Sequence, residues 1–336
     1  MSKLCLLALV ACRAPLAPDK DAADALVGPL DETFRVPDWR DREYLLHLPP
    51  AYDGATALPV VLAFHGGGGK KEGVNRSSCP GGDEEDEGCL NAVADREGFI
   101  VVYPDGVDAP GVKHRSWNAG GGEDGWRCVG GQACEEGSDD VAYVDALLAE
   151  LERALWVDED RVFATGISNG AAMSHRLACE RSEVFAAIAP IAGANQAQAV
   201  PGCEPSRPVP VLHMHGTEDP CWGWDGTISE PLCAGAGEGA FMDVETSMEG
   251  WRERNGCRSS TETARADKDP DDGTTVVEVV GTACAADTVL LRIEGGGHTW
   301  PDGWQYLGES RIGRVSHELN GNEELWRFFE EHPRGQ

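Results

Sequence analysis

The clearest chemical signal in the sequence is the pentapeptide G-I-S-N-G at residues 166–170. It lies between a predicted strand that ends at Thr165 and a predicted helix that begins near Ala171. A serine at such a strand-to-helix turn is held above the sheet, and small residues two places before and after it let the strand and the helix approach closely. The glycines at both ends of the pentapeptide meet this requirement. The pattern therefore predicts that Ser168 is a nucleophile.

Acid and base residues follow Ser168 in the order that such a nucleophile requires. A serine hydroxyl reacts slowly until a histidine accepts its proton, and a carboxylate must hold that histidine in the right tautomer. The stretch H-G-T-E-D-P at 215–220 follows one predicted strand, and G-G-G-H-T-W-P at 295–301 follows a later one. We expect Asp219 to be the orienting acid and His298 to be the base. Two nearby carboxylates are the alternatives for the acid, Glu218 and Asp225.

A glycine-rich turn supplies candidate donors for the negative charge that develops when a serine attacks a carbonyl group. The sequence H-G-G-G-G at 65–69 follows a predicted buried strand, where backbone N–H groups can point at that charge. A glycine run alone is more often a plain loop, but its place upstream of the Ser168 turn favours this role. We assign the oxyanion hole to the N–H groups of Gly67 and Asn169. The three glycines before His298 predict a flexible loop that brings the imidazole over the serine.

Two tryptophans are candidates for the substrate pocket, although each residue type is also common in a core. Trp300 lies two residues after His298, and an aromatic face there would suit an aromatic acyl group. Trp117 is the second candidate. We predict that both rings line the pocket.

The elements that must position these residues alternate along the chain. Short apolar runs bounded by Gly or Pro predict buried strands, and amphipathic segments between them predict helices. The predicted strands are 44–48, 59–64, 99–103, 162–165, 185–192, 209–214, 275–280 and 289–293, and the predicted helices are 90–98, 139–155, 171–179, 248–255 and 322–331. This order predicts an α/β fold with a mostly parallel central sheet and helices on both faces.

Charge and composition narrow the class of protein. Among 336 residues, 28 are Lys or Arg and 58 are Asp or Glu, which gives a formal net charge of −30. Phosphate binding needs a basic surface, so a nucleic-acid partner is excluded. Hydrophobic residues make up 41% of the chain and aromatic residues 7%, which is enough to bury a core. We expect a folded protein that works as a monomer.

The N-terminal region predicts export. Residues 1–11 hold Lys3 and a short apolar run, and we expect them to be a signal peptide. The sequence L-V-A-C at 9–12 resembles the lipobox of bacterial lipoproteins, which implies a lipid on Cys12; the alternative is an ordinary signal peptide with a fortuitous cysteine. Residues 12–30 are rich in Ala, Pro and Asp and are expected to be a tether. Residues 31–333 then form one catalytic domain, placed outside the cell or in its envelope.

The 12 cysteines support an oxidising compartment, because no paired C-x-x-C motif suggests a zinc site. Without Cys5 and Cys12, ten cysteines remain, an even number that fits five disulfides. Their clustering predicts that sequence neighbours pair and clip loops: Cys79 with Cys89, Cys128 with Cys134, Cys179 with Cys203, Cys221 with Cys233, and Cys257 with Cys284.

Three further stretches extend these motifs to most of the predicted domain. They are A-D-R-E-G-F-I-V-V-Y-P-D-G (94–106), S-W-N-A-G (116–120) and D-D-V-A-Y-V (139–144). With H-G-G-G-G, G-I-S-N-G, H-G-T-E-D-P and G-G-G-H-T-W-P, in this order, the chain resembles secreted α/β-hydrolase esterases grouped with feruloyl esterases and polyhydroxybutyrate depolymerase-like proteins, the relatives of carbohydrate esterase family one. The resemblance implies an α/β-hydrolase fold. It also implies a Ser168, Asp219 and His298 triad that hydrolyses carboxylic esters through an acyl-enzyme, without a cofactor.

Departures from the family pattern bear on the substrate. Polyester depolymerases tend to carry an H-G-C-x-Q motif and an added polymer-binding domain, whereas this chain has Gly67 in that motif and no length left for a second module. We therefore expect a feruloyl or acetyl ester on plant polysaccharide, or a short hydroxyalkanoate ester. Three alternatives stay open: a polyhydroxybutyrate-type depolymerase, a serine peptidase of the same fold, and a non-catalytic surface binding module.

Other candidate sites are weaker, and we expect no bound metal. The acidic stretch 267–273 has its glycine one place late for an EF-hand, an intruding proline and no glutamate at position twelve. His213 and His215 face one side of a strand but lack a third ligand. The acidic segment 70–89 is expected to be a solvated loop between Cys79 and Cys89, with a lid edge as the alternative.

Overall fold

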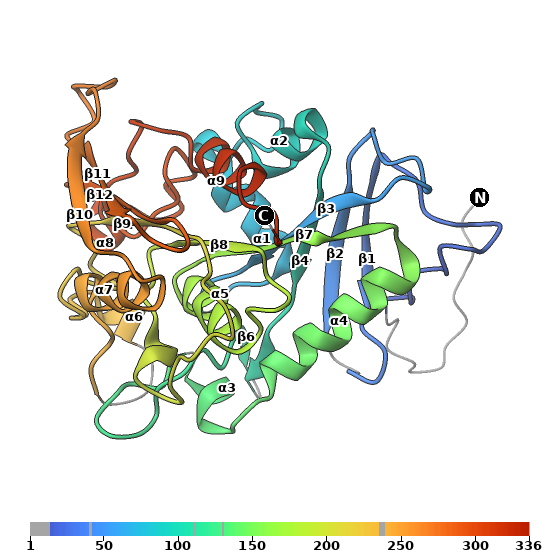
Figure 1. Cartoon of the computed structure of the whole chain (residues 1–336), viewed down its shortest axis with the longest axis horizontal. Helices are drawn as coiled ribbons and strands as arrows, with labels where there is room; N and C mark the ends of the chain where they lie inside the picture. Colours follow the sequence, from blue (N-terminus) through green and yellow to red (C-terminus); the bar gives the residue numbers. More distant parts are fainter. Residues whose placement is uncertain (1–13, 40–41, 110–111, 130, 235–238, 336) are drawn as a thin grey trace.

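The structure is a computed structural model that describes residues 14–39, 42–109, 112–129, 131–234 and 239–335. The predicted signal peptide 1–11 and Cys12 lie outside these residues. Helices cover both faces of one large sheet (Figure 1), so the predicted α/β class is confirmed.

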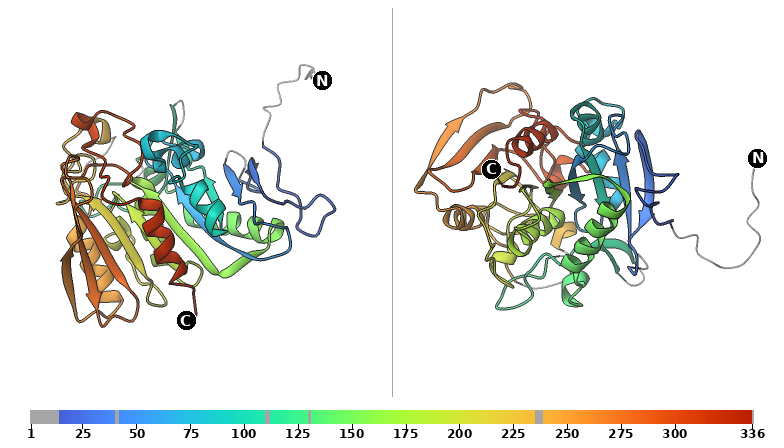
Figure 2. Two further views of the ribbon diagram at one scale, coloured as in Figure 1. Left: turned by 90° about the horizontal axis from the view of Figure 1, so that it is seen from above. Right: turned by 45° about the vertical axis from the view of Figure 1, so that its right-hand side comes forward.

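Ten strands of the described chain form the large sheet, in the order β1-β2-β4-β3-β7-β8-β9-β12-β11-β10. Their bounds are Leu30–Arg35 (β1), Glu43–Leu48 (β2), Leu58–Phe64 (β3), Ile100–Pro104 (β4), Val157–Ile167 (β7), Ala187–Ile191 (β8), Val211–Gly216 (β9), Ser259–Ala264 (β10), Thr275–Thr282 (β11) and Thr288–Glu294 (β12). Strands β5 (Val107–Ala109) and β6 (Val112–Ser116) form a separate pair. Neighbours from β4 to β12 are parallel, and the outer strands at both ends pair antiparallel (Figure 2).

The register brings the ends of four parallel strands to one edge of the sheet. Ile167 of β7 pairs with Ile191 of β8, which pairs with Met214 of β9, which pairs with Leu291 of β12. The loops that follow these strands therefore leave the sheet side by side. Crevices at this edge are where open α/β sheets bind their ligands.

Side chains of the strands alternate between two hydrophobic clusters, one on each face of the sheet. In β3, Val60, Leu62 and Phe64 belong to one cluster and Val61 and Ala63 to the other. Helices α4 (Asp140–Ala154), α5 (Asn169–Glu180) and α7 (Val244–Arg254) cover the first face, which we call the α5 face. Helices α1 (Lys71–Ser78), α2 (Leu90–Glu97) and α9 (Gly321–Glu330) cover the second, the α9 face. Shorter helical segments lie in the loops, at Pro80–Gly82 (η1), Gln132–Glu135 (α3), Gln196–Gln198 (η2), Pro231–Ala234 (α6) and Glu309–Ile312 (α8).

The predicted strands and helices all occur, with ends shifted by at most five residues. Strands β1, β5, β6 and β10, helix α1 and the short helical segments are additional. Strand β10 has the sequence S-S-T-E-T-A, and every one of its side chains is exposed, so it lacks the apolar alternation that predicts a strand. Helix α1 lies within the stretch 70–89 that we expected to be a loop. The acidic part of that stretch, residues 83–87, is largely exposed beside the Cys79–Cys89 disulfide.

The described part of the expected tether contacts the domain. Ala17 is buried in the core of the α5 face, and the N–H of Lys20 donates to the carbonyl of Arg153. The ammonium of Lys20 also lies 4.4 Å from the ring centre of Trp156. Residues 17–20 therefore contact the end of helix α4, while the domain boundaries at 11, 30 and 333 stay predictions.

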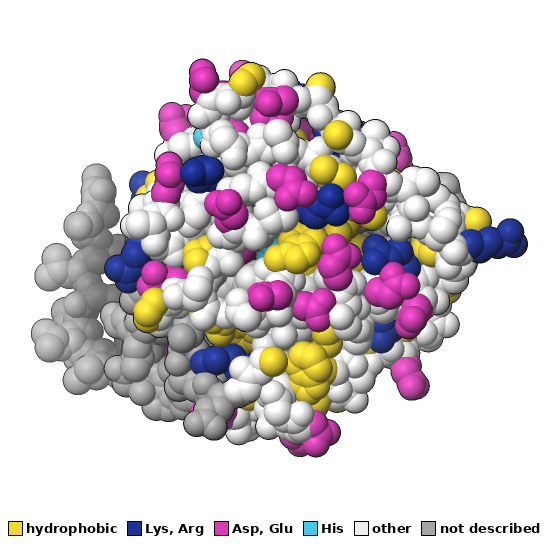
Figure 3. Space-filling view, turned by 90° about the vertical axis from the view of Figure 1, so that its left-hand side faces the viewer, with side chains coloured by type: hydrophobic (Ala, Val, Ile, Leu, Met, Phe, Trp, Pro, Cys, Tyr) yellow, Lys and Arg dark blue, Asp and Glu magenta, His cyan; other side chains and the backbone are white. Residues whose placement is uncertain are grey.

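All five predicted disulfides are confirmed: Cys79–Cys89, Cys128–Cys134, Cys179–Cys203, Cys221–Cys233 and Cys257–Cys284. Each joins sequence neighbours separated by 6 to 27 residues, so each clips one loop or one pair of adjacent elements. Among the described residues, no helix has the length and apolar character needed to cross a membrane. Figure 3 shows acidic side chains spread over one face of the molecule, between small hydrophobic patches and scattered basic groups.

Candidate active site

Ser168 occupies the strained turn that the sequence predicts between β7 and α5. Its backbone has φ 59° and ψ −122°, a region that residues other than glycine rarely adopt. Its N–H donates to the carbonyl of Ile191 in the next strand at 2.9 Å, which holds the turn against the sheet. The flanking glycines are required by close approach: a Cβ would lie 2.5 Å from the Phe64 carbonyl oxygen at Gly166, and 2.2 Å from the same oxygen at Gly170.

Asp219 follows β9 and is held as a carboxylate acceptor. Its Oδ1 accepts hydrogen bonds from the N–H of Cys221 at 2.7 Å and from the N–H of Trp222 at 2.8 Å. Its Oδ2 accepts from Nδ1 of His298 at 2.7 Å. The side chain has no exposed surface, so these donors replace the water that an ionised carboxylate would otherwise need.

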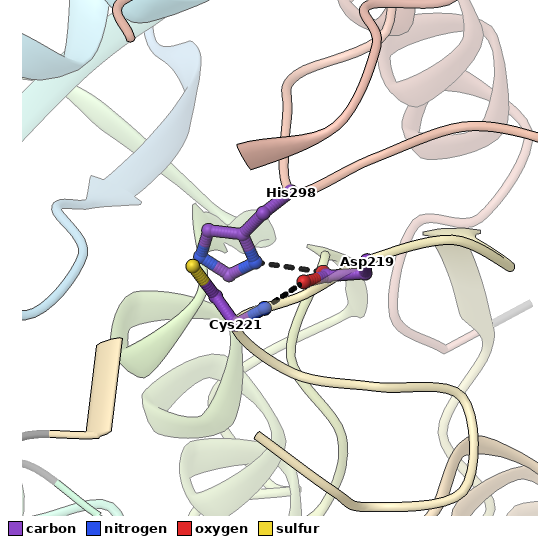
Figure 4. A group of neighbouring side chains, drawn as sticks. All are labelled: Asp219, Cys221 and His298. Carbon is purple, nitrogen blue, oxygen red and sulfur yellow. Dashed lines mark hydrogen bonds and ion pairs between the residues drawn. The ribbon is translucent and has the colours of Figure 1, made fainter. Parts of the chain in front are cut away.

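His298 follows β12 and meets Asp219, as Figure 4 shows. Because Nδ1 donates to the carboxylate, the neutral ring leaves Nε2 as its proton acceptor. The hydroxyl of Tyr306 donates to the backbone carbonyl of His298 at 3.0 Å and fixes the loop from the other side. Gly297 packs against Gly313, where a Cβ would lie 2.4 Å from the Gly313 Cα. The glycines before His298 thus allow close packing, a different role from the flexible loop that we expected.

The two alternative acids do not reach the histidine. Glu218 is exposed, and its backbone N–H donates to the carbonyl of Gly296. Asp225 is also exposed, and its Oδ1 accepts from the N–H and the hydroxyl of Thr227 within its own turn. Asp219 is therefore the carboxylate that geometry places beside His298.

Ser168 and His298 belong to the same edge of the sheet but are not hydrogen bonded to each other. The strands that carry them, β7 and β12, are separated by β8 and β9. Within the described residues, no hydrogen bond joins the Ser168 hydroxyl to the imidazole. Bonds between a nucleophile and its base are often long before substrate binds and shorten in the complex.

The two predicted oxyanion donors lie next to each other. A Cβ on Gly67 would contact the Cβ of Asn169 at 3.8 Å, so the H-G-G-G-G turn faces the start of α5. Neither N–H donates a hydrogen bond to another group in the described part of the chain. Asn169 has no helical acceptor for its N–H because it is the first residue of α5. Both donors therefore remain available to a developing negative charge.

The Asn169 side chain has a role that the sequence did not predict. Its Oδ1 accepts from the N–H of Trp117 at 2.7 Å, and its Nδ2 donates to the carbonyl of Trp117 at 2.9 Å. On the far side of this loop, Asp140 accepts from the N–H of Asn118 at 2.6 Å and from Arg42. The S-W-N-A-G and D-D-V-A-Y-V stretches are thus joined around the start of α5. Nothing in the sequence indicates this link, which the fold shows.

His65 is a second residue whose role emerges from the structure. One ring nitrogen bonds to the carbonyl of Gly66 at 2.8 Å, and the other accepts from the N–H of Gly106 at 2.9 Å. Burial lowers the pKa of His65 to about 4, so the ring stays neutral near neutral pH. A neutral ring with one donor and one acceptor matches these two partners. His65 therefore holds the glycine turn that carries Gly67.

Trp117 and Trp300 lie in the core. Trp117 is 0% exposed and donates its indole N–H to the carbonyl of His65 at 2.9 Å, and Trp300 is 1% exposed. The prediction that they line the substrate pocket is not supported by an exposed ring face. Residue type and proximity to His298 cannot distinguish a pocket wall from a buried support for the loop.

Among the residues that the structure describes, one side-chain group has ligand spacing for a metal, namely Asp219, Cys221 and His298 (Figure 4). Cys221 is bonded to Cys233, so its sulfur is not a thiolate ligand. Both oxygens of Asp219 already accept hydrogen bonds. The donor set therefore does not fit a metal. The acidic stretch 267–273 is used in turns, where Asp269 accepts from the N–H of Asp271 and Asp272 from that of Thr274.

Comparisons with known proteins find relatives that are esterases. Residues 42–202 match the family model described as Esterase PHB depolymerase. The chain is 31% identical over 299 residues to "Putative esterase NocK" of Nocardia uniformis subsp. tsuyamanensis, covering 84% of this chain and 77% of that protein. It is 26% identical over 274 residues to "Feruloyl esterase B" of Piromyces equi, covering 79% of this chain but 45% of that protein.

A solved structure shares the fold. "Acetyl xylan esterase from Aspergillus awamori" matches with a TM-score of 0.53 and 16% identity, over 86% of this chain and 94% of that one. The α/β-hydrolase class that the sequence predicts is thereby confirmed. The chain belongs to the esterase family of the Nocardia relative, and it is a carboxylic ester hydrolase.

Proposed function

We propose that the protein is a serine esterase that works through an acyl-enzyme on Ser168, with His298 as base and Asp219 as orienting acid. The observation that carries this proposal is the 2.7 Å hydrogen bond from His298 Nδ1 to a fully buried Asp219 carboxylate. It leaves Nε2 as the proton acceptor at the sheet edge where Ser168 sits in its strained turn.

The reaction has two halves. Ser168 Oγ attacks the ester carbonyl carbon while Nε2 of His298 takes the hydroxyl proton, and the N–H groups of Gly67 and Asn169 stabilise the negative oxygen. The tetrahedral intermediate collapses, and the imidazolium returns the proton to the departing alcohol. Water then attacks the acyl-serine with His298 again as base, which releases the carboxylic acid and restores Ser168.

The proposed substrate is a feruloyl or acetyl ester on plant polysaccharide, with a short hydroxyalkanoate ester as the second possibility. Support comes from the named activities of the relatives, a feruloyl esterase and an acetyl xylan esterase. This chain spans 45% of the length of that feruloyl esterase, so its substrates do not transfer directly. Methyl ferulate, acetylated xylan and hydroxybutyrate oligomers, compared by kcat/KM, test the assignment.

Replacement of Ser168 by Ala tests the nucleophile. We expect Ser168→Ala to lower kcat for p-nitrophenyl acetate by about 10⁶-fold and to abolish labelling by a fluorophosphonate. Ser174→Ala is the matched control, because Ser174 lies in the same helix and its buried hydroxyl donates to the Gly170 carbonyl. Full turnover in Ser168→Ala would refute the triad, and cleavage of a peptide library in preference to esters would favour a serine peptidase.

We also propose that the enzyme is exported and acts as a monomer. The five disulfides support an oxidising compartment. Attachment through a lipid on Cys12 belongs to the same proposal. Mass spectrometry of the mature N-terminus from membrane and medium fractions would detect the lipid, and an unlipidated N-terminus in both would exclude it.

A further inference from the structure

Four buried rings lead from helix α7 to the Asp219 loop, and we call Trp251, His175, His213 and His215 the histidine chain. The indole N–H of Trp251 donates to Nδ1 of His175 at 2.9 Å. Nε2 of His175 lies 3.2 Å from Nδ1 of His213, and Nε2 of His213 lies 3.1 Å from Nδ1 of His215. These four rings come from α7, α5 and β9, and each is at most 1% exposed.

The indole N–H of Trp251 sets the direction of the hydrogen bonds along the histidine chain. An indole N–H can only donate, so Nδ1 of His175 must accept, and the proton of the neutral ring sits on Nε2. That N–H makes Nδ1 of His213 an acceptor in turn, and the same argument places the proton of His215 on Nε2. One tautomer is therefore imposed on all three histidines.

The last ring meets both sides of the Asp219 turn. Nε2 of His215 lies 2.8 Å from the carbonyl of Trp222 and 3.5 Å from Oδ2 of Asp219. Trp222 also donates its own N–H to Oδ1 of Asp219 at 2.8 Å. His215 thus holds the carbonyl of Trp222, while the N–H of Trp222 holds the Asp219 carboxylate.

We propose that His175, His213 and His215 are positioning residues that orient the Asp219 carboxylate toward His298. The chain directs an N–H at the Trp222 carbonyl, which fixes the 219–222 turn and aims the second oxygen of Asp219 at the base. This inference rests on the proposed triad. It adds a specific support that reaches from α7, on the α5 face, to the acid of the site.

In the neutral state, every ring nitrogen of the histidine chain has a hydrogen-bond partner. The three rings hold three protons for the three acceptors that follow them, and the indole occupies the remaining nitrogen. Burial agrees with this state: it lowers the pKa of His175 to about 3, with Arg254 adding to the effect, and lowers the pKa of His213 and of His215. The geometry of these rings therefore fits a support for the 219–222 turn.

Nitrogen-15 NMR of the histidine rings tests the chain without reference to activity. We expect His175, His213 and His215 in the wild-type protein to be neutral Nε2–H tautomers from pH 5.5 to 7.5. Any of the three found as an Nδ1–H tautomer or as a cation in this range would overturn the proposal. Ser168→Ala should show the same three signals. The NMR result therefore tests the histidine tautomers independently of whether the proposed triad is correct.

Kinetics of paired variants test whether the chain positions Asp219. His215→Leu removes the donor to Trp222, and we expect kcat to fall about tenfold to a hundredfold with little change in KM. His215→Gln places an amide N–H near the position of Nε2 and should recover a large part of that loss. Equal kcat in wild type and in folded His215→Leu would refute the proposal, as would equal losses in the Leu and Gln variants.

A variant in helix α7 gives a test that does not depend on the folding of the His215 variants in β9. Trp251→Phe keeps a ring in place but removes the first donor, so the tautomer order is no longer imposed. We expect kcat to fall about threefold to tenfold and a second histidine tautomer to appear in the NMR spectrum. Trp326→Phe, on the α9 face, is the matched control and should leave kcat unchanged. A Trp251→Phe enzyme that melts lower but keeps the kcat and tautomers of the wild type would show a structural role only.

Discussion

The two faces of the sheet bury tryptophans in different ways. On the α5 face, the indole N–H groups of Trp117, Trp222 and Trp251 each donate a hydrogen bond at 2.9 Å, to His65, Met242 and His175 respectively. On the α9 face, the indole N–H groups of Trp300 and Trp326 are buried and have no hydrogen-bond partner among the described residues.

The difference extends to the surroundings of these rings. The α9 face is packed by aromatic stacks, with Phe99 on Trp326 at 4.0 Å and Phe163 on Phe329 at 4.5 Å between ring centres. The α5 face contains the histidine chain that ends at Asp219. Apolar packing stabilises a fold without choosing one orientation for each ring, whereas a satisfied polar network fixes orientation. Removing the stacked rings of the α9 face should therefore lower stability and leave activity unchanged, whereas changes in the histidine chain of the α5 face should also lower activity.

Asp219→Asn should give the largest effect on the α5 side. The amide keeps the shape of the carboxylate but lacks its charge and permits the wrong tautomer of His298, so we expect kcat to fall about 10⁴-fold. The thermal melt should change little, because the loop is also clipped by Cys221–Cys233. A loss of activity below tenfold, measured on p-nitrophenyl acetate, would mean that another carboxylate orients the base.

Phe329→Ala is the opposite test on the α9 face. The ring is fully buried and stacked on Phe163, so its removal should lower the free energy of unfolding by about 3 to 5 kcal/mol. The variant should keep the kcat of the wild type below its melting temperature. Urea unfolding and kinetics on the same preparation give both numbers, and a fall in kcat larger than the fall in folded fraction would break the contrast between the faces.

Low pH should reduce the free energy of unfolding, because several buried histidines on the α5 side are neutral in the folded protein. Burial lowers the pKa of His65 to about 4 and that of His175 to about 3, and it also lowers the pKa of His213 and His215. As pH falls below about 6.5, the unfolded chain takes up protons that the folded chain does not, so stability is full above this pH and is lost below it.

The expected slope is at most about 1.4 kcal/mol per pH unit for each histidine. Urea unfolding between pH 6.5 and 5 measures it, above the range in which most carboxylates titrate. His175→Gln should have a flatter slope than the wild type, because it removes one of these histidines. A stability that does not vary from pH 6.5 to 5 would contradict the neutral chain.

Local patterns in the sequence predict most of this architecture and the identity of the site residues. The apolar runs of β3 and β4 predict strands because both faces of a parallel strand are buried. The disulfides are predictable because each closes a short segment. The turn around Ser168 is predictable because glycines must flank it. These features depend on residues that are close together in the chain.

Features that depend on distant residues are not predictable in the same way. His175 and His213 are 38 positions apart, and nothing in their spacing indicates that an indole sets their tautomers. Trp117 and Trp300 have the residue type of a pocket wall, but their burial follows from packing between elements. Strand β10 has only exposed side chains, so no apolar pattern in its sequence predicts that it pairs with β11.

A matched pair of tryptophan variants gives the smallest and most discriminating test. Trp251→Phe leaves Nδ1 of His175 buried without a donor and should lower the free energy of unfolding by about 1 to 3 kcal/mol. Trp326→Phe removes an N–H that has no partner, so the lost contacts with Phe99 are offset and the change should stay within about 1 kcal/mol. Both variants remove the same atoms from a buried ring, so the difference between them isolates the hydrogen bond. If the two losses measured by urea unfolding are equal, the indole bond to His175 adds nothing to stability, and the α5 face is held by packing as the α9 face is.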